Sequence, residues 1–148
     1  MGCFSSKPPA EFKHIADFLT ANGYHDAKIV CVSRKKHSYL VVNDLGDMVY
    51  ATSINLGSLI DRNDVKLRVI CVREQLMQDG VNFKSKLCDN GDMCLSWGFE
   101  TELISGRKHY TFRIYCAHKT HFLCLEYDPE VKNAEFEAKL VDFFTHLC

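Results

Sequence analysis

Between Lys28 and Tyr127 the chain consists largely of short segments in which apolar and polar residues alternate, and this period of two is its strongest constraint on the fold. Half-buried strands show such alternation because successive side chains point to opposite faces of a sheet. Turn signals, such as Asp44 to Asp47 and Asp89 to Asp92, separate the segments. We expect about seven or eight antiparallel strands among nine candidate segments. These are Lys28–Ser33, Ser38–Asn43, Met48–Ser53, Val65–Arg73, Val81–Cys88, Met93–Trp97, Glu100–Ile104, Tyr110–Cys116 and His121–Tyr127.

Two segments outside this region have the spacing of amphipathic helices. Glu11 to Asn22 repeats apolar residues at i, i+3, i+6 and i+7, and Gly23 is a suitable helix stop. This helix could lie on a bilayer, but we expect its apolar face to pack on the protein's own core. Residues 129–147 form the most regular predicted helix, with an apolar face made by Val131, Phe136, Leu140, Phe143, Phe144 and Leu147.

The number of strands in so short a chain favours a closed arrangement. An open sheet of this size would leave long unpaired edges, which small β proteins avoid by closure. The sequence therefore predicts a mainly β (α+β) fold, a small antiparallel barrel or sandwich closed by the C-terminal helix. An alternative is a β-trefoil, because residues 29–32 echo residues 69–72 and residues 44–48 echo residues 89–93.

The last third of the predicted body resembles the pleckstrin-homology (PH) fold. The likeness runs from Thr111 to Phe144 and comprises a strand, a turn, a second strand and an acidic helix with aromatic anchors. PH domains usually place a tryptophan on that helix, whereas this chain offers Phe143 or Phe144. The resemblance implies that residues 11–148 form a single PH-like domain that includes the N-terminal helix.

The chain opens with the sequence MGCFSSKPP, which matches the pattern for N-myristoylation. Gly2 becomes terminal once methionine is removed, and Ser6 supplies the hydroxyl that the pattern requires. Cys3, beside the acylated glycine, is suited to carry a palmitate. One myristate binds a membrane only marginally, with an association constant of about 10⁴ M⁻¹, so stable anchoring needs such a second chain. Residues 1–10 are therefore predicted to be an acylated flexible tether.

This N-terminal segment resembles the dual-acylation signals of Src-family kinases and of some G-protein α subunits. The combination of this signal with a PH-like domain is similar to the inner-membrane-complex sub-compartment proteins of apicomplexan parasites. These resemblances imply a peripheral, lipid-anchored protein on the cytoplasmic face of the plasma membrane or of an internal membrane. They transfer the anchoring chemistry and leave the role of the body open.

Charge is balanced over the whole chain and uneven along it. The formal net charge is −1, which argues against a nucleic-acid partner, since phosphate contacts need an excess of basic residues. Residues 1–40 contain six basic and three acidic residues. The basic turn Arg34, Lys35 and Lys36 is a candidate for contact with anionic lipid headgroups, because several cations on one turn can bind several phosphate oxygens. Ordinary solvated surface charge is the alternative interpretation.

The eight cysteines do not indicate a disulfide framework. Residues 1–24 lack the apolar core of a secretory signal, and no stretch has the roughly 18 apolar residues of a membrane-spanning helix. We therefore expect a reducing compartment and mostly free thiols, with Cys31, Cys71, Cys116 and Cys124 as small apolar residues within strands.

A metal site and a catalytic site are both disfavoured by the sequence. Cys116, His118, His121 and Cys124 have zinc-ligand chemistry, but a hairpin turning at 118–121 pairs residue 116 with 123 and residue 115 with 124, so the four side chains do not converge. No cysteine–histidine pair sits in a known catalytic signature, and no phosphate-binding loop or paired-carboxylate motif is present. We predict no cofactor, no metal and no catalytic residue.

The sequence favours a non-enzymatic adaptor or scaffold that binds a protein partner at the cytosolic face of a membrane. The first alternative is a module that senses phosphoinositides or other anionic lipids through Arg34, Lys35 and Lys36. The second alternative is an interaction domain of the β-trefoil type.

Overall fold

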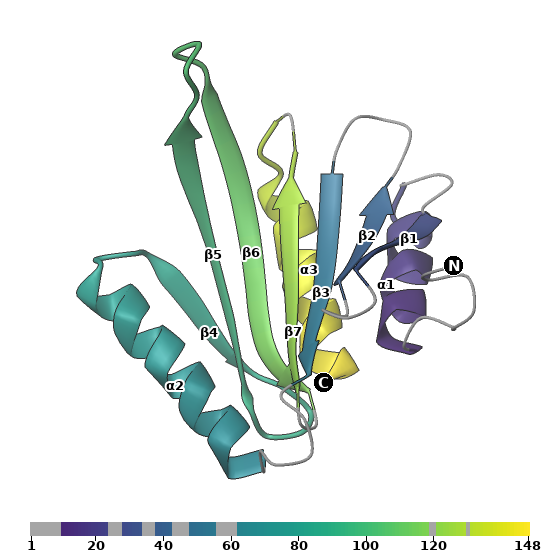
Figure 1. Ribbon diagram of the computed structural model, residues 1–148, viewed down its shortest axis with the longest axis vertical. Coiled ribbons are helices and arrows are strands. Elements are labelled where there is room, and N and C mark those ends of the chain that lie inside the picture. The colour runs from purple at the N-terminus through teal and green to yellow at the C-terminus, as the bar shows by residue number, and fades with distance from the viewer. Residues whose placement is uncertain are drawn as a thin grey trace.

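The computed structural model describes residues 10–23, 28–33, 38–42, 48–55, 62–118, 121–129 and 131–148. Helices and strands alternate along this part of the chain in the order α-βββ-α-ββββ-α. Figure 1 shows one continuous, strongly twisted sheet with helices packed on it. The elements are α1 (Ala10–Ala21), β1 (Lys28–Ser33), β2 (Ser38–Val42), β3 (Met48–Asn55), α2 (Arg62–Gln78), β4 (Phe83–Leu87), β5 (Met93–Glu102), β6 (Lys108–His118), β7 (His121–Asp128) and α3 (Ala134–Leu147).

The seven strands form an open antiparallel sheet in the order β1-β2-β3-β7-β6-β5-β4. The sheet consists of a three-strand unit, β1 to β3, and a four-strand unit, β4 to β7. The two units join where β3 pairs with β7, from Met48 opposite Asp128 to Asn55 opposite His121. β1 and β4 lie at the two edges and do not pair with each other. The predicted PH-like barrel closed by a helix was therefore wrong, as was the trefoil alternative.

The physical reason for the open sheet lies in its edges. β1 and β4 are only 6 and 5 residues long, so little unpaired backbone remains for closure to satisfy. On β4, Lys84 and Lys86 are exposed, and charged lysines on an edge strand oppose pairing with another chain. The shortness of both edge strands and the exposed lysines of β4 protect this sheet from pairing with other chains, as closure would in a barrel.

α2 replaces a strand that the alternation had predicted at Val65–Arg73. The same residues also carry a helical spacing: Val69 and Leu76 are buried against the sheet, and Val72 packs beside them. The helix ends at Gln78, and Gly80 in the turn that follows has a φ of +70°, a conformation that glycine adopts without strain. Taken alone, the segment fits both the two-residue repeat of a strand and the 3.6-residue repeat of a helix. It forms a helix because its apolar residues pack on the sheet.

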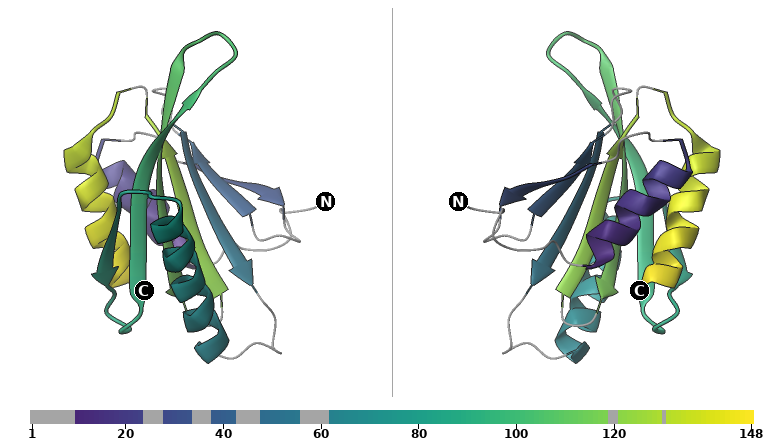
Figure 2. Two further views of the ribbon diagram at one scale, coloured as in Figure 1. Left: turned by 90° about the vertical axis from the view of Figure 1, so that its left-hand side faces the viewer. Right: turned by 90° about the vertical axis from the view of Figure 1, so that its right-hand side faces the viewer.

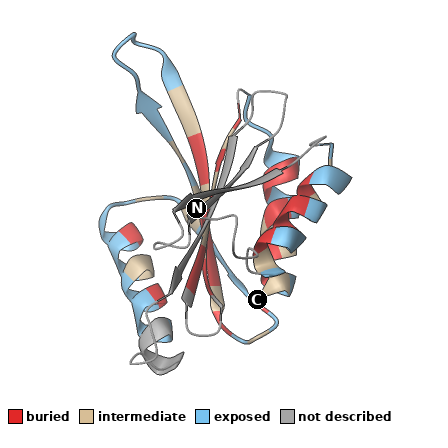
Figure 3. Cartoon of the chain, turned by 45° about the vertical axis from the view of Figure 1, so that its right-hand side comes forward, coloured by how far each residue is buried: buried red, intermediate tan, exposed pale blue. Residues whose placement is uncertain are grey.

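The helices cover the two faces of the sheet unequally. α1 and α3 lie on one face and α2 lies on the other (Figure 2). Buried residues line the inner sides of α1 and α3 (Figure 3). The larger core cluster joins Phe12, Ile15 and Leu19 of α1 with Phe136, Leu140 and Phe144 of α3 and with Phe112, Ile114, Cys116, Leu123, Leu125 and Tyr127 of the sheet.

Both terminal helices were predicted correctly, but Val131, which was assigned to the apolar face of the C-terminal helix, precedes that helix and is exposed. In α1 the expected apolar face is buried in the protein's own core, and Gly23 follows the helix with a φ of +97°. α3 begins at Ala134 rather than at residue 129, because Asn133 caps it by accepting a hydrogen bond of 3.1 Å from the Phe136 backbone N–H. The helix covers one face of the sheet and does not close a barrel.

A smaller difference from the prediction concerns β5. β5 is one strand of 10 residues, whereas the sequence predicted two segments, Met93–Trp97 and Glu100–Ile104. The extra length pairs with β6, and Glu100 lies opposite Tyr110. The longer β5 and β6 form a hairpin that projects beyond the rest of the sheet (Figure 1). The turn at its tip contains Gly106, with a φ of +82°.

The packing of α3 can be tested through Leu140, which is completely buried. Replacing Leu140 with alanine should lower the free energy of unfolding by about 2–5 kcal/mol, since large core side chains lose both burial and packing. The measurement is chemical denaturation followed by circular dichroism. Val131→Ala is the control, because Val131 is largely exposed and its loss should leave the midpoint almost unchanged. Equal midpoints for the two variants would show that α3 does not belong to the core.

Candidate functional site

The site residues predicted from the sequence lie outside the described residues. Gly2 and Cys3 precede Ala10, the first described residue, by eight and seven positions. Arg34, Lys35 and Lys36 fall in the connection between β1 and β2. Both predictions therefore stay predictions, and a candidate site within the described residues has to be built from the helices and the sheet.

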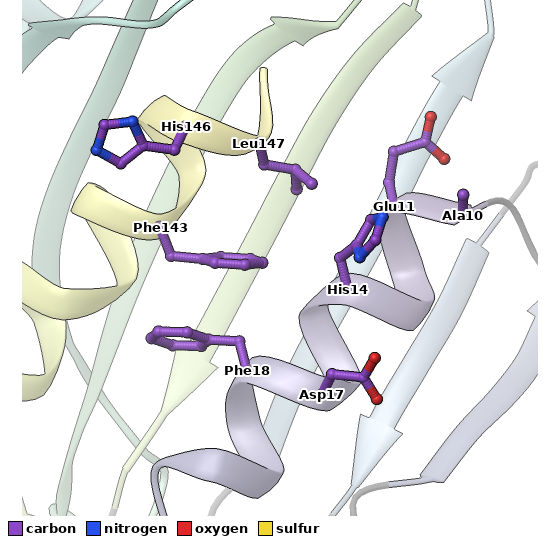
Figure 4. Close-up of a pocket in the computed structure, with 8 residues that line it drawn as sticks. All are labelled: Ala10, Glu11, His14, Asp17, Phe18, Phe143, His146 and Leu147. Carbon is purple, nitrogen blue, oxygen red and sulfur yellow. The ribbon is translucent and has the colours of Figure 1, made fainter.

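A groove of about 730 Å³ lies between α1 and α3 (Figure 4). The rings of Phe18 and Phe143 stack between the two helices, with centroids 4.4 Å apart and planes 21° apart. Leu147 adds a further apolar side chain from α3. The groove also includes Ala10, where the predicted tether joins the body. The remaining lining residues are Glu11, His14, Asp17 and His146.

His146, at the rim of this groove, lies close to two carboxylates. Its Nδ1 atom is 3.1 Å from the Asp89 carboxylate and its Nε2 atom is 3.6 Å from Asp142. An aromatic floor with a charged rim is suited to binding an amphipathic segment.

A second exposed surface runs along α2. Leu67 and Met77 are 58% and 53% exposed, and Ile70 is exposed between them. At 100° per residue these three positions fall within an arc of about 80° on one side of the helix. Leu87 of the neighbouring edge strand β4 is 73% exposed and lines a shallow pocket together with Ile70. We call Leu67, Ile70, Met77 and Leu87 the α2 stripe.

Basic residues accompany the α2 stripe. On the same helical wheel, Lys66 and Arg73 lie within about 40° of one side of the stripe. The acidic residue Glu74 falls inside the arc of the stripe, and Arg68 lies about 100° away on the other side. Lys66 forms an ion pair with Asp92, with 3.7 Å between its Nζ atom and Oδ1. An apolar strip beside basic side chains is typical of a surface that meets another protein.

The β6–β7 hairpin confirms the register predicted from the sequence. Cys116 lies opposite Leu123, and Tyr115 lies opposite Cys124. Cys116 belongs to the core under α1 and α3, whereas Cys124 packs with the cluster under α2. The two cysteines therefore face opposite sides of the sheet. Among the described residues, no group of three or more histidine, cysteine or carboxylate side chains is arranged to hold a metal ion.

Four cysteines gather at one end of the α3-covered face, which the sequence did not predict. Cys88, Cys94 and Cys116 are buried in the larger core cluster, and half-buried Cys148 packs against it. The Sγ atoms of Cys116 and Cys148 are 2.9 Å apart. Because these cysteines come from a turn, two strands and the end of a helix, no local spacing could have revealed the cluster.

Burial and contact with neighbouring thiols keep the Cys116 thiol protonated. Hydrogen bonds with Cys148, Cys88 and Cys94, together with burial, raise the pKa of Cys116 well above its usual value. On the other face of the sheet, burial and then the nearby Glu126 raise the pKa of Cys124 to about 12. Cys71, predicted to be an apolar residue of a strand, is exposed because its segment is helical.

Comparisons of the chain with protein families, with curated proteins and with solved structures found no match.

Proposed function

We propose that this chain is a non-enzymatic adaptor that acyl groups on Gly2 and Cys3 hold at the cytosolic face of a membrane, and that its folded body binds a protein partner. The observation that carries the proposal is the sequence MGCFSSK at the N-terminus, in which the myristoylated glycine and a second acylation site are adjacent. Two acyl chains give the stable attachment that one chain does not.

Within the described ranges, none of the helices combines the length and apolar character that a membrane span requires. Under this proposal the acyl groups provide the anchoring energy, and the body remains outside the bilayer.

The fold favours the α2 stripe as the surface for the partner. The tether joins the body at α1, and α2 lies on the opposite face of the sheet (Figure 2). Attachment through α1 therefore leaves Leu67, Ile70, Met77 and Leu87 open to the cytosol. Their exposure and the basic side chains beside them suit a partner with an apolar centre and acidic groups at its rim.

The anchor is tested by changing its two acylation sites separately. Gly2→Ala should move the protein from the membrane fraction to the cytosol. Without myristate the protein no longer binds membranes transiently, and palmitoylation of Cys3 depends on that transient binding. Cys3→Ser should leave weak, reversible binding through myristate alone. The measurements are fractionation of cells and the mass of the N-terminal peptide. A Gly2→Ala protein that stays with membranes as fully as the wild type would show that acylation is not the anchor.

Vesicle binding by the protein without acyl groups distinguishes the proposed adaptor function from a lipid-sensing function. The unmodified body should bind vesicles containing anionic lipid poorly, and replacing Arg34, Lys35 and Lys36 with glutamine should change this little. Headgroup-selective binding at micromolar concentration, abolished by the triple replacement and weakened by salt, would instead assign the body to lipid sensing.

The partner surface is tested with the double replacement of Leu67 and Met77 by glutamate. Proteins cross-linked to the acylated wild type in cells are compared with those cross-linked to this variant, and the bound partner should fall at least tenfold. Ile104→Glu is the matched control, because Ile104 is fully exposed and lies at the tip of the β5–β6 hairpin, away from α2. A partner retained equally by all three proteins would exclude the α2 stripe.

A further inference from the structure

The cluster of Cys88, Cys94, Cys116 and Cys148 has no role in the adaptor proposed above. Cys94 lies directly opposite Cys116 in the β5–β6 pairing, and Cys88 precedes the turn that leads into β5. Cys148 follows the last turn of α3 and donates its backbone N–H to the Phe144 carbonyl. The four cysteines therefore connect the C-terminal end of α3 to the sheet.

The distance within the cluster distinguishes two kinds of thiol chemistry. A tetrahedral zinc site with bonds of about 2.3 Å separates its sulfur atoms by roughly 3.8 Å. A disulfide bond joins its sulfur atoms at about 2.05 Å. The 2.9 Å between the Sγ atoms of Cys116 and Cys148 is too short for a shared zinc ion, and only a small movement separates the pair from bonding distance.

We propose that Cys116 and Cys148 are a site of reversible disulfide formation, in which oxidised glutathione or a similar small disulfide is the oxidant. Cys148 is the point of entry, because it is only half-buried whereas Cys116 has no exposed surface. This inference does not depend on acylation or on the α2 stripe.

The reaction proceeds by two thiol–disulfide exchanges. The Cys148 thiolate attacks one sulfur of oxidised glutathione, and the first glutathione leaves as a thiolate that takes up a proton. Cys116 then loses its proton and attacks the Cys148 sulfur, and the second glutathione leaves in the same way. One protein disulfide and two reduced glutathione molecules result, so the two protein thiols are oxidised as one glutathione disulfide is reduced.

The surroundings of Cys148 make the reaction slow at neutral pH. The hydrogen bond with Cys116 lowers the pKa of Cys148, but the hydrogen bond with Cys88, burial and the nearby Asp92 raise it to about 12. Below that pKa the thiolate fraction grows tenfold with each pH unit. The rate of disulfide formation should therefore rise about tenfold per unit between pH 7 and pH 9.

Closing this bond would fix the end of α3 on β6. The bond encloses β7 and all of α3 in one covalent loop, which restricts the unfolded chain. Phe143, His146 and Leu147 of the α1–α3 groove lie in the last turns of that helix. The oxidised protein should accordingly melt several degrees higher than the reduced protein.

The experiment uses the full chain, purified reduced and incubated at a series of ratios of reduced to oxidised glutathione. Remaining thiols are alkylated, and peptides are identified by mass spectrometry without reduction. Trypsin cleavage after Arg113, Lys119 and Lys139 places Cys116 and Cys148 on different peptides. We expect a linked pair of these peptides, the loss of two alkylatable thiols, and reversal by dithiothreitol.

Variants identify the bond independently. Cys148→Ser should lack the linked peptides and the rise in melting temperature, whereas Cys124→Ser, on the other face of the sheet, should retain both. Direct mapping of the wild type decides the question even if Cys148→Ser folds poorly. The proposal is overturned if Cys148 stops at a glutathione adduct, if another pair of cysteines links, if exposed Cys71 reacts while Cys116 and Cys148 stay reduced, or if the purified protein holds zinc on these thiols.

Discussion

The pairing of β3 with β7 is the interaction on which the rest of this structure depends. It joins eight residues of the first three-strand unit, from Met48 to Asn55, to the last strand of the second unit, from His121 to Asp128. Without it the chain would form two small sheets, each with a further long edge. With it, β7 lies in the middle of the sheet, and Leu123, Leu125 and Tyr127 line the face that α1 and α3 cover.

The central position of β7 also explains why the two ends of the chain meet. α1 precedes the first strand and α3 follows the last one, yet both pack on the same face. Phe18 of α1 stacks on Phe143 of α3 with a centroid separation of 4.4 Å. The two helices thereby form the groove that includes Ala10, where the predicted tether joins the body, while the opposite face is left to α2 and its exposed stripe.

Burial gives the cysteines of this protein different chemistry. Cys71 is exposed on α2, whereas Cys94 is buried. The hydrogen bond with Cys116 lowers the pKa of Cys94, but the hydrogen bond with Cys88 and burial together raise it well above its usual value. Such protonated thiols react slowly with oxidants in general. Cys116 and Cys148 differ in this respect because they lie close together. Once Cys148 has formed a mixed disulfide with glutathione, the Cys116 sulfur is already positioned to attack it.

Local sequence determined the elements whose signals are local. The i, i+4, i+8 spacing of Phe136, Leu140 and Phe144 predicted the buried face of α3, and each of these residues is buried. The turn at 118–121 predicted the pairing of Cys116 with residue 123, because hairpin register follows from the position of the turn. The N-terminal acylation pattern is likewise local, and it remains a prediction from sequence.

Tertiary structure alone decided the features that depend on distant residues. The segment at 65–73 fits both a strand and a helix, and burial of Val69 and Leu76 against the sheet made it α2. The strand order places β7 between β3 and β6, and nothing in the strands themselves specifies that order. Cys88, Cys94, Cys116 and Cys148 meet for the same reason. Their contact is created by long-range strand pairing and by helix packing, which leave no periodic signal in the sequence.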